Sequence, residues 1–180
     1  MNDQMLSGQH PPLNDTREAG SFRDDPSRER QPETTRKLQL LSVGSLVLGI
    51  FEDEIATIAE WRRPTPLPHA PLAVLGVVSI QGRILTVLDP LYLFGETSTP
   101  LGFPFEIQVA LRGDEQIALA VENTGETLDL APRDIQPPLE TLIRVVGGIF
   151  HYGDQRVNVI QVKELFPAAL RGRERRRRRF

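Results

Sequence analysis

From Leu38 onward, short apolar segments alternate with clusters of turn-forming residues. In residues 105–112 and 116–121, apolar side chains alternate with polar or small ones, a period of two that is typical of a β-strand with one buried face. The pattern predicts roughly nine or ten short strands. Dipeptides that favour tight turns connect the apolar segments, and we expect hairpins or turns at Gly44-Ser45, Gln81-Gly82, Gly113-Asp114 and Gly153-Asp154.

Helical segments are predicted to be short. The stretch EDEIATIAE places Ile55 and Ile58 three residues apart, a spacing that suits one or two helical turns. In DPLYLFGE, Asp89 is the expected N-cap, Pro90 the first helical residue and Gly95 the residue that ends the turn.

The remaining segments favour an all-β fold. Four prolines within residues 62–71 prevent a helix and interrupt strand pairing, so we expect an extended surface loop. Residues 162–166 predict only a terminal helical turn. No segment carries a 3.6-residue period long enough for a helix of average length, about 11 residues. Short strands with turn signals every ~8–12 residues indicate β-barrels or a sandwich.

Composition and charge divide the chain into three parts. Residues 1–37 are poor in large apolar side chains and rich in proline and charged residues, so we expect a disordered N-terminal tail. Residues 38–170 carry 8 basic and 16 acidic residues, a net charge of −8. Residues 171–180 carry 7 arginines and 1 glutamate, a net charge of +6. We therefore expect an acidic domain at 38–167 followed by a basic C-terminal tail at 168–180.

The sequence lacks the residue patterns of catalytic and metal sites. There is no cysteine, and His10, His69 and His151 are scattered without the spacing of metal ligands. No nucleophile elbow or phosphate-binding glycine loop is present. Consecutive carboxylates at residues 52–54 are typical of a solvated surface. We expect no enzymatic activity, no metal and no cofactor.

The beginning of the sequence bears on where the protein acts. The first residues lack the basic start and apolar run of a signal peptide. No apolar stretch approaches the ~20 residues that a helix needs to cross a bilayer. The lack of cysteine fits a reducing compartment. We expect a cytoplasmic protein that is not an integral membrane protein.

Six short motifs follow one another between Leu48 and Gly95. They read Leu48-Gly49-Ile50, Ile55-Ala56-Thr57-Ile58, Pro68-His69-Ala70-Pro71, Gly76-Val77-Val78-Ser79-Ile80-Gln81-Gly82, Asp89-Pro90 and Phe94-Gly95. In this order and spacing they resemble the chemotaxis coupling protein (CheW-like) family. Segments 117–130 and 145–166 are similar to later strands of the same family. The resemblance covers about residues 38–167.

The resemblance implies both a fold and a role. The fold is a pair of SH3-like five-stranded β-barrels packed on a shared apolar core, with short helical turns. The role is that of a non-catalytic signalling adaptor, which holds a histidine kinase regulatory domain and the cytoplasmic tip of a chemoreceptor by protein–protein contact. The motif residues with an expected structural role are Gly49, Pro68, Pro71, Gly76, Gly82, Asp89 and Gly95.

The same resemblance implies a receptor-side surface at Ile55, Thr57, Ile58 and Gln81. The family usually has glutamate at the position of Thr57 and arginine at that of Gln81, and the two pair. Both charges are absent from this chain. Loss of one partner from a buried pair leaves an uncompensated charge, whereas loss of both can be nearly neutral. We expect a tolerated double change, which leaves open whether the usual receptor is bound.

Trp61 lies beside two arginines at the entrance of the proline-rich loop. An indole at such a position either caps the core or anchors a partner protein. Both interpretations are retained.

The C-terminal arginines are the feature that the resemblance leaves unexplained. Such a run is either a solvated tail or a site for nucleic acid, anionic lipid or an acidic protein surface, which includes the acidic body of this chain or of a neighbouring copy. The alternative function is therefore a nucleic-acid- or anion-binding β-barrel protein, and a membrane-peripheral adaptor is a third. The acidic body, without basic strands interleaved with aromatics, argues against nucleic acid. The candidate polyanion-binding residues are Arg173, Arg175, Arg176, Arg177, Arg178 and Arg179.

Overall fold

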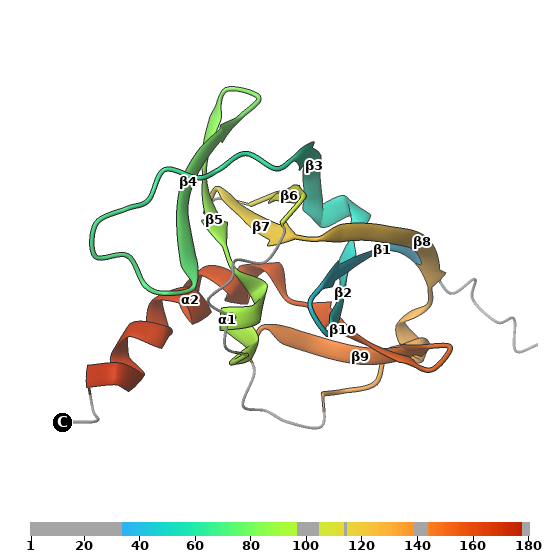
Figure 1. The fold of residues 1–180 in the computed structure, drawn as a ribbon. Coiled ribbons are helices and arrows are strands. Elements are labelled where there is room, and N and C mark those ends of the chain that lie inside the picture. Colours follow the sequence, from blue (N-terminus) through green and yellow to red (C-terminus); the bar gives the residue numbers. More distant parts are fainter. Residues whose placement is uncertain (1–33, 97–104, 114, 139–143, 178–180) are drawn as a thin grey trace, which may run out of the picture. The chain divides into compact units, whose positions relative to one another are not determined.

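Ten strands form two five-stranded sheets in the part of the chain that the computed structural model describes, residues 34–96, 105–113, 115–138 and 144–177 (Figure 1). These residues belong to the unit Glu33–Phe180. The first sheet has the order β8-β1-β2-β10-β9 and the second the order β3-β6-β7-β5-β4. The strands of the first sheet are β1 (Arg36–Val43), β2 (Leu46–Phe51), β8 (Asn123–Leu130), β9 (Val146–Tyr152) and β10 (Gln155–Ile160). Those of the second are β3 (Ile55–Glu60), β4 (Val74–Ile80), β5 (Arg83–Leu88), β6 (Ile107–Leu111) and β7 (Ile117–Val121).

Both sheets are paired in the same way. The middle strand of each, β2 or β7, has one antiparallel neighbour and one parallel neighbour. In the first sheet, the segment after edge strand β8 crosses to the opposite edge strand, β9, through the bridge Gln136↔Ile149. In the second sheet, the segment after edge strand β3 crosses to β4 through the bridge Thr65↔Val77. Each sheet therefore closes into a small barrel, which we call barrel 1 and barrel 2. The predicted all-β fold of two five-stranded barrels is confirmed.

Three clusters of buried apolar side chains hold the barrels together. One cluster fills barrel 1, one fills barrel 2, and the largest lies between them and takes residues from both. Strand β1 contributes to two clusters, because Leu38 and Leu40 face the interior of barrel 1 whereas Leu41 and Val43 face the shared cluster. Each fully buried leucine or valine stabilises the fold by about 1.5–3 kcal/mol. The shared core predicted for the two barrels is therefore present.

Helix α1 (Pro90–Phe94) forms as its capping residues predict. Asp89 Oδ1 accepts a hydrogen bond of 3.0 Å from the Leu91 backbone N–H, and Pro90 is the first helical residue. Gly95 ends the helix with a left-handed φ of 80°. The predicted hairpins β1–β2, β4–β5 and β9–β10 are also present.

The helical prediction at Ile55 and Ile58 is wrong. A short 3₁₀ turn, η1, covers Glu52–Glu54, and strand β3 begins at Ile55. β3 is antiparallel to β6 along its length, so the backbone groups of this segment find their partners in a neighbouring strand. The β-branched side chains of Ile55, Thr57 and Ile58 suit a strand better than a helix.

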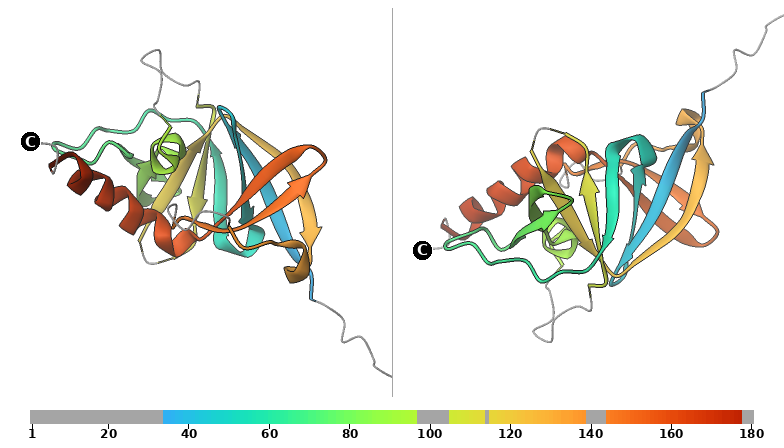
Figure 2. Two further views of the ribbon diagram at one scale, coloured as in Figure 1. Left: turned by 90° about the horizontal axis from the view of Figure 1, so that it is seen from below. Right: turned by 90° about the horizontal axis from the view of Figure 1, so that it is seen from above.

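The C-terminal segment is a helix rather than a single turn. Helix α2 spans Val162–Arg177, 16 residues, so the expectations of a terminal turn and of no helix of average length are both wrong. Val162, Leu165 and Ala169 are buried in the shared cluster, and this packing stabilises the first half of the helix. Figure 2 shows α2 leading away from barrel 1 on the side of barrel 2.

Two further expectations concern the ends of the chain. β1 begins at Arg36, two residues before the predicted start at Leu38. The rest of the predicted N-terminal tail falls almost entirely outside the described residues.

Within the described residues, no helix combines the length and the apolar character that crossing a membrane requires.

Candidate functional site

The tip of the β4–β5 hairpin presents Gln81. Ile80 pairs with Arg83, so the turn contains only Gln81 and Gly82, with φ values of 50° and 78°. Two positive φ values define the type I′ turn, whose twist matches that of the flanking strands. The turn leaves the Gln81 side chain exposed to solvent.

Strand β3 brings Thr57 to the same place. Gln81 Nε2 donates a hydrogen bond of 3.4 Å to Thr57 Oγ1, at the long end of the range. Thr57 is half-buried. The two positions at which the family usually carries its charge pair therefore meet in this chain. Because Gln81 is exposed, the large energies of a deeply buried ion pair do not apply to this pair of positions.

Ile55 and Ile58, the other two predicted receptor-side residues, have different environments. The Ile58 side chain is 43% exposed on β3. Ile55 is half-buried and packs against the shared cluster, and its carbonyl oxygen accepts a 2.9 Å hydrogen bond from Arg112 Nε. Thr57 and Gln81 are therefore in contact. Ile58, the next residue of β3, is exposed on the opposite face of the strand, whereas Ile55 packs against the shared cluster.

Gly76 allows the loop after β3 to close barrel 2. The Thr65 and Val77 backbones exchange hydrogen bonds of 2.8 and 2.9 Å, which bring the Thr65 carbonyl against Gly76. A Cβ on Gly76 would overlap with the Thr65 carbonyl oxygen and lie 2.7 Å from its carbonyl carbon. The φ of Gly76 is 143°, a value that is open to glycine alone.

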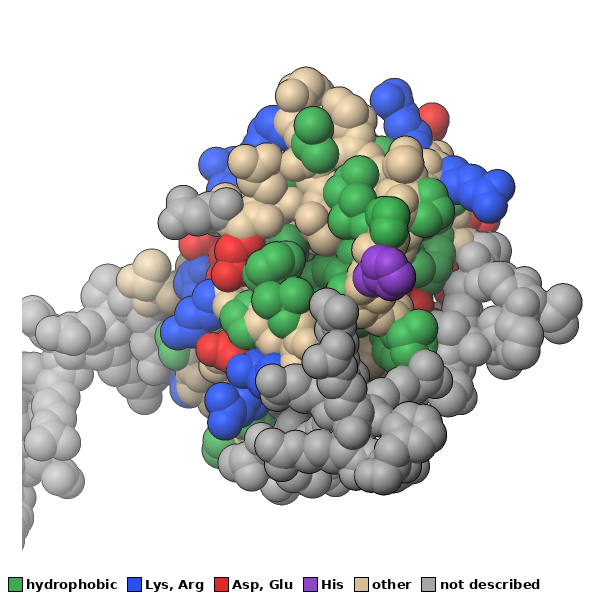
Figure 3. Space-filling model, turned by 90° about the vertical axis from the view of Figure 1, so that its left-hand side faces the viewer, with side chains coloured by type: hydrophobic (Ala, Val, Ile, Leu, Met, Phe, Trp, Pro, Cys, Tyr) green, Lys and Arg blue, Asp and Glu red, His purple; other side chains and the backbone are tan. Residues whose placement is uncertain are grey.

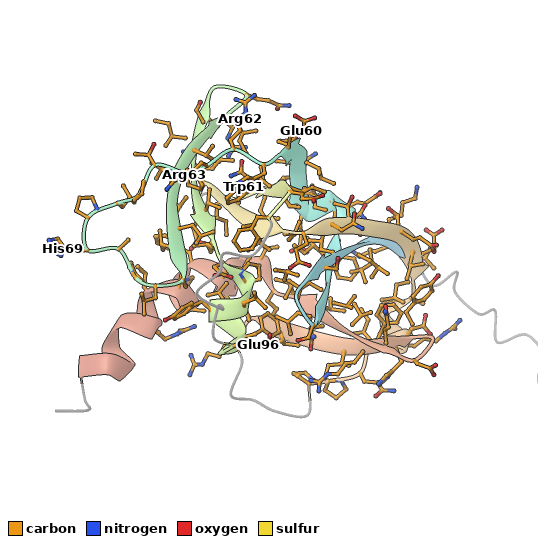
Figure 4. All side chains as sticks on the ribbon, viewed as in Figure 1. Glu60, Trp61, Arg62, Arg63, His69 and Glu96 are labelled. Atoms are coloured by element: carbon orange, nitrogen blue, oxygen red, sulfur yellow. The ribbon has the colours of Figure 1, made fainter. Side chains whose placement is uncertain are left out.

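Of the other motif residues, Gly49 lies in a barrel interior, whereas Pro68 and Pro71 lie in a surface loop. Gly49 lies inside barrel 1, where a Cβ would come within 2.6 Å of Leu38 Cδ2. Pro68 is exposed and Pro71 is half-buried, and both belong to the loop that leads to β4. Figure 4 shows His69 at the outer end of this loop. None of these residues contributes a polar group to the Thr57–Gln81 surface.

Trp61 packs within barrel 2. Its ring centroid lies 5.2 Å from that of Phe105, with the rings tilted by 41°, and the side chain joins the barrel 2 cluster. The contact favours the core-capping interpretation of this residue.

An open groove, which the sequence did not indicate, lies close to Ile55. It has a volume of about 330 Å³ and is bounded by η1, the β6–β7 turn and the start of α2. Glu54, Arg112 and Lys163 supply charged groups, and Val162 supplies apolar surface. Burial raises the pKa of Glu54 above its ordinary value, although the Arg36 guanidinium acts in the opposite direction. Long-range packing alone assembles this groove from three segments.

The structure describes the backbone of only part of the predicted polyanion-binding site. Arg173, Arg175, Arg176 and Arg177 lie on the last turns of α2. Arg178 and Arg179 lie outside the described residues. In the described parts of the chain, no three His, Asp or Glu residues are grouped so that they could hold a metal ion.

Restoring the family's charges should produce a measurable interaction between positions 57 and 81. We expect Thr57→Glu alone to lower stability, because it places a carboxylate at a half-buried site without a partner. The double variant Thr57→Glu/Gln81→Arg should recover part of the loss, with a coupling energy of about 0.2–1 kcal/mol. Urea unfolding of the four proteins in a double-mutant cycle measures this energy. In the control cycle, the neutral Thr57→Gln takes the place of Thr57→Glu, with Gln81→Arg unchanged. A coupling that is the same in both cycles would contradict the prediction.

Two chemotaxis proteins are similar in sequence to this chain. The chain is 30% identical over 102 residues to a chemotaxis protein CheW of Rhizobium meliloti (strain 1021), which covers 57% of this chain and 66% of that protein, just under two thirds of its length. It is 23% identical over 135 residues to a probable chemotaxis protein CheW of Rhizobium etli, which covers 73% of this chain and 87% of the relative.

A solved structure shares the fold. The scaffolding protein TtCheW from Thermoanaerobacter tengcongensis aligns with a TM-score of 0.66 and 20% sequence identity, over 74% of this chain and 93% of the other. At this identity the likeness concerns the fold, a pair of SH3-like barrels. None of these comparisons supports the nucleic-acid alternative.

The family itself follows from a match that covers most of the chain. Residues 37–169 match the model of the CheW-like domain, and they include both barrels and the first half of α2. The match, the relatives and the fold agree with one another. The chain belongs to the CheW-like domain family.

Proposed function

We propose that this protein couples a chemoreceptor to a chemotaxis-type histidine kinase. Membership of the CheW-like family supports a role as a chemotaxis adaptor. The finer proposal is that the protein holds the cytoplasmic tip of a receptor on one surface and the regulatory domain of a kinase on another. It acts by protein–protein contact, without chemistry of its own.

The receptor-side surface is proposed to consist of Ile58, Thr57 and Gln81. The observation that carries the proposal is the 3.4 Å contact between Gln81 and Thr57, which joins the hairpin tip to β3 beside the exposed Ile58. The Thr57–Gln81 contact is uncharged, because these residues replace the family's ion pair. Receptor contact at these two positions therefore depends on polar contact, burial and shape rather than on the family's ion pair.

A charge placed on this surface should weaken receptor binding. We expect Ile58→Glu to raise the dissociation constant for a soluble chemoreceptor tip fragment by about tenfold or more, because a carboxylate would be buried at the interface without a partner. Isothermal titration calorimetry measures the constant.

The chain offers a matched control for this experiment. Ile84 is also an exposed isoleucine of barrel 2, 66% exposed on β5, and it is not one of the three residues proposed to contact the receptor. Ile84→Glu adds the same charge and should leave receptor binding within about twofold. Equal losses in both variants would contradict the proposed surface. If the unmodified protein bound neither receptor tip nor kinase regulatory domain, the coupling function itself would be wrong.

A further inference from the structure

The last turns of α2 form a strongly basic end to the described part of the molecule. Between Arg171 and Arg177 the sequence has five arginines and one glutamate, a net charge of +4. The backbone of this segment is helical as far as Arg177. Helices rise by about 1.5 Å per residue, so Arg177 lies roughly 12 Å along the axis beyond Ala169, the last residue of α2 in the shared cluster. The charge is therefore carried on a helix rather than on a free coil.

The segments on the side of the molecule to which α2 leads include a long stretch without carboxylates. Residues 61–88, which form the proline-rich loop, β4 and β5, contain no aspartate or glutamate and three arginines, Arg62, Arg63 and Arg83. In Figures 1 and 2 the last turns of α2 lie on the same side as this loop. Figure 3 views that side and shows hydrophobic side chains gathered around its histidine. Among the described residues, this loop, β4 and β5 therefore offer α2 no carboxylate, and the ion pair that an α2 arginine does make, Arg171–Glu164 at 3.4 Å, lies within the helix itself.

The acidic residues concentrate elsewhere. Turn η1 and strand β8 lie next to each other, since Thr127 Oγ1 donates a 3.2 Å hydrogen bond to Glu52. Two basic residues of β1 reduce the charge of this region, because Arg36 pairs with Asp53 and Lys37 stands opposite Asp129. Its net charge is still −3. The acidic residues of this η1–β8 surface are Glu52, Asp53, Glu54, Glu126 and Asp129.

The two oppositely charged regions lie at opposite sides of the described unit. Figure 1 places β8 at the right and the end of α2 at the left, and both views of Figure 2 keep this separation. Because α2 is helical and its first half is packed into the core, the backbone of its last turns leads away from η1 and β8 of the same chain. The two oppositely charged segments of one molecule therefore lie apart from each other.

We propose that the basic end of α2 binds the acidic η1–β8 surface of a second copy of this protein. The charges are complementary, and the chain itself provides both surfaces. The contact joins two different surfaces, so it is head-to-tail and can continue from copy to copy. Exposed ion pairs are weak individually and are screened by salt, so the association is reversible and depends on ionic strength. The residues of this contact differ from those proposed for the receptor-side surface, Ile58, Thr57 and Gln81.

Sedimentation velocity of the full chain, at several protein concentrations and two ionic strengths, tests the proposal. We expect self-association at about 0.05 M salt and its loss at about 1 M salt, where the screening length is only ~3 Å. Replacement of Arg173, Arg175, Arg176 and Arg177 by glutamine should weaken association by about tenfold or more. Glutamine and arginine have similar helix propensities, so the helix should be retained, and circular dichroism checks this.

Two further variants separate the contact from a general effect of charge. Lysine at the same four positions preserves the charge and should preserve association. Arg144→Gln/Arg156→Gln removes positive charge from exposed positions outside both surfaces and should also leave association unchanged. On the receiving surface, Glu126→Gln/Asp129→Asn should weaken association in the same direction as the α2 variant.

Several results would overturn the proposal. It is wrong if the unmodified protein stays monomeric at low salt, or if the glutamine variant of α2 associates as strongly as the unmodified protein. It is also wrong if the α2 arginines are required only for binding to vesicles that contain phosphatidylserine, while association between copies does not depend on them. In that case the basic end of α2 is a site for anionic lipid.

Discussion

Replacing Gly76 by alanine should destabilise the protein by about 3 kcal/mol. Two independent effects lower the stability of the Gly76→Ala variant. Its Cβ would overlap with the Thr65 carbonyl oxygen, and its φ of 143° is strained for every residue that has a side chain. Relief of the overlap requires the Thr65–Val77 bridge to open, and this bridge closes barrel 2. Urea unfolding followed by circular dichroism measures the loss.

Gly82 provides the control for this experiment. It also has a positive φ, 78°, but a Cβ there would meet no atom within 4 Å. Gly82→Ala should therefore cost only the conformational strain, about 1 kcal/mol. If the two alanine variants unfolded at the same urea concentration, the close approach of Thr65 to Gly76 would not be the reason for the glycine.

Replacing Leu165 by alanine should cost about 2–5 kcal/mol. Leu165 is 1% exposed and belongs to the cluster shared by the two barrels. Its removal would leave a cavity where α2 meets both barrels, so we expect a single lowered unfolding transition rather than local loss of the helix. The change in the midpoint of chemical unfolding, followed by circular dichroism and by Trp61 fluorescence, checks both statements.

Leu170 on the same helix gives the comparison. Its side chain is 48% exposed, and Leu170→Ala should change stability by no more than about 0.5 kcal/mol. Equal effects at the two positions would mean that α2 behaves as an appendage and not as part of the shared core.

Local signals predicted the elements that local interactions stabilise. Helix α1 formed where an N-cap aspartate, a proline at the first position and a closing glycine coincide. The β4–β5 turn formed at Gln81-Gly82 because few sequences tolerate two successive positive φ values. Contacts with distant parts of the chain contribute little to the conformation of such elements, so their local sequence signatures predict them well.

The wrong predictions occurred where distant contacts outweigh local preference. Ile55 and Ile58 have the spacing of a helix face, but the neighbouring strand β6 offers hydrogen bonds to the whole segment and β3 results. Helix α2 has a proline at position 167, and the arginines of its second half are like charges that repel one another on a helix. It begins in the shared cluster, and tertiary burial of Val162 and Leu165 starts a helix that local sequence alone does not predict.

The candidate site was predictable only in part. Thr57 and Gln81 were paired by resemblance, and the structure brings them to 3.4 Å. The resemblance could not separate Ile58, which is exposed, from Ile55, which packs against the core, because burial depends on which strands surround β3. The groove beside Glu54 had no sequence signal, since its walls come from three distant segments.

The sequence by itself determined the strands other than β3, most of the turns between them, the acidic body and the basic end, because each depends on side-chain chemistry within a few residues. Only the tertiary structure decided how the strands close into two barrels, that α2 is helical as far as Arg177, and that the basic and acidic regions lie on opposite sides. These features depend on contacts between residues far apart in the chain, and the free energy of burying the shared core selects them.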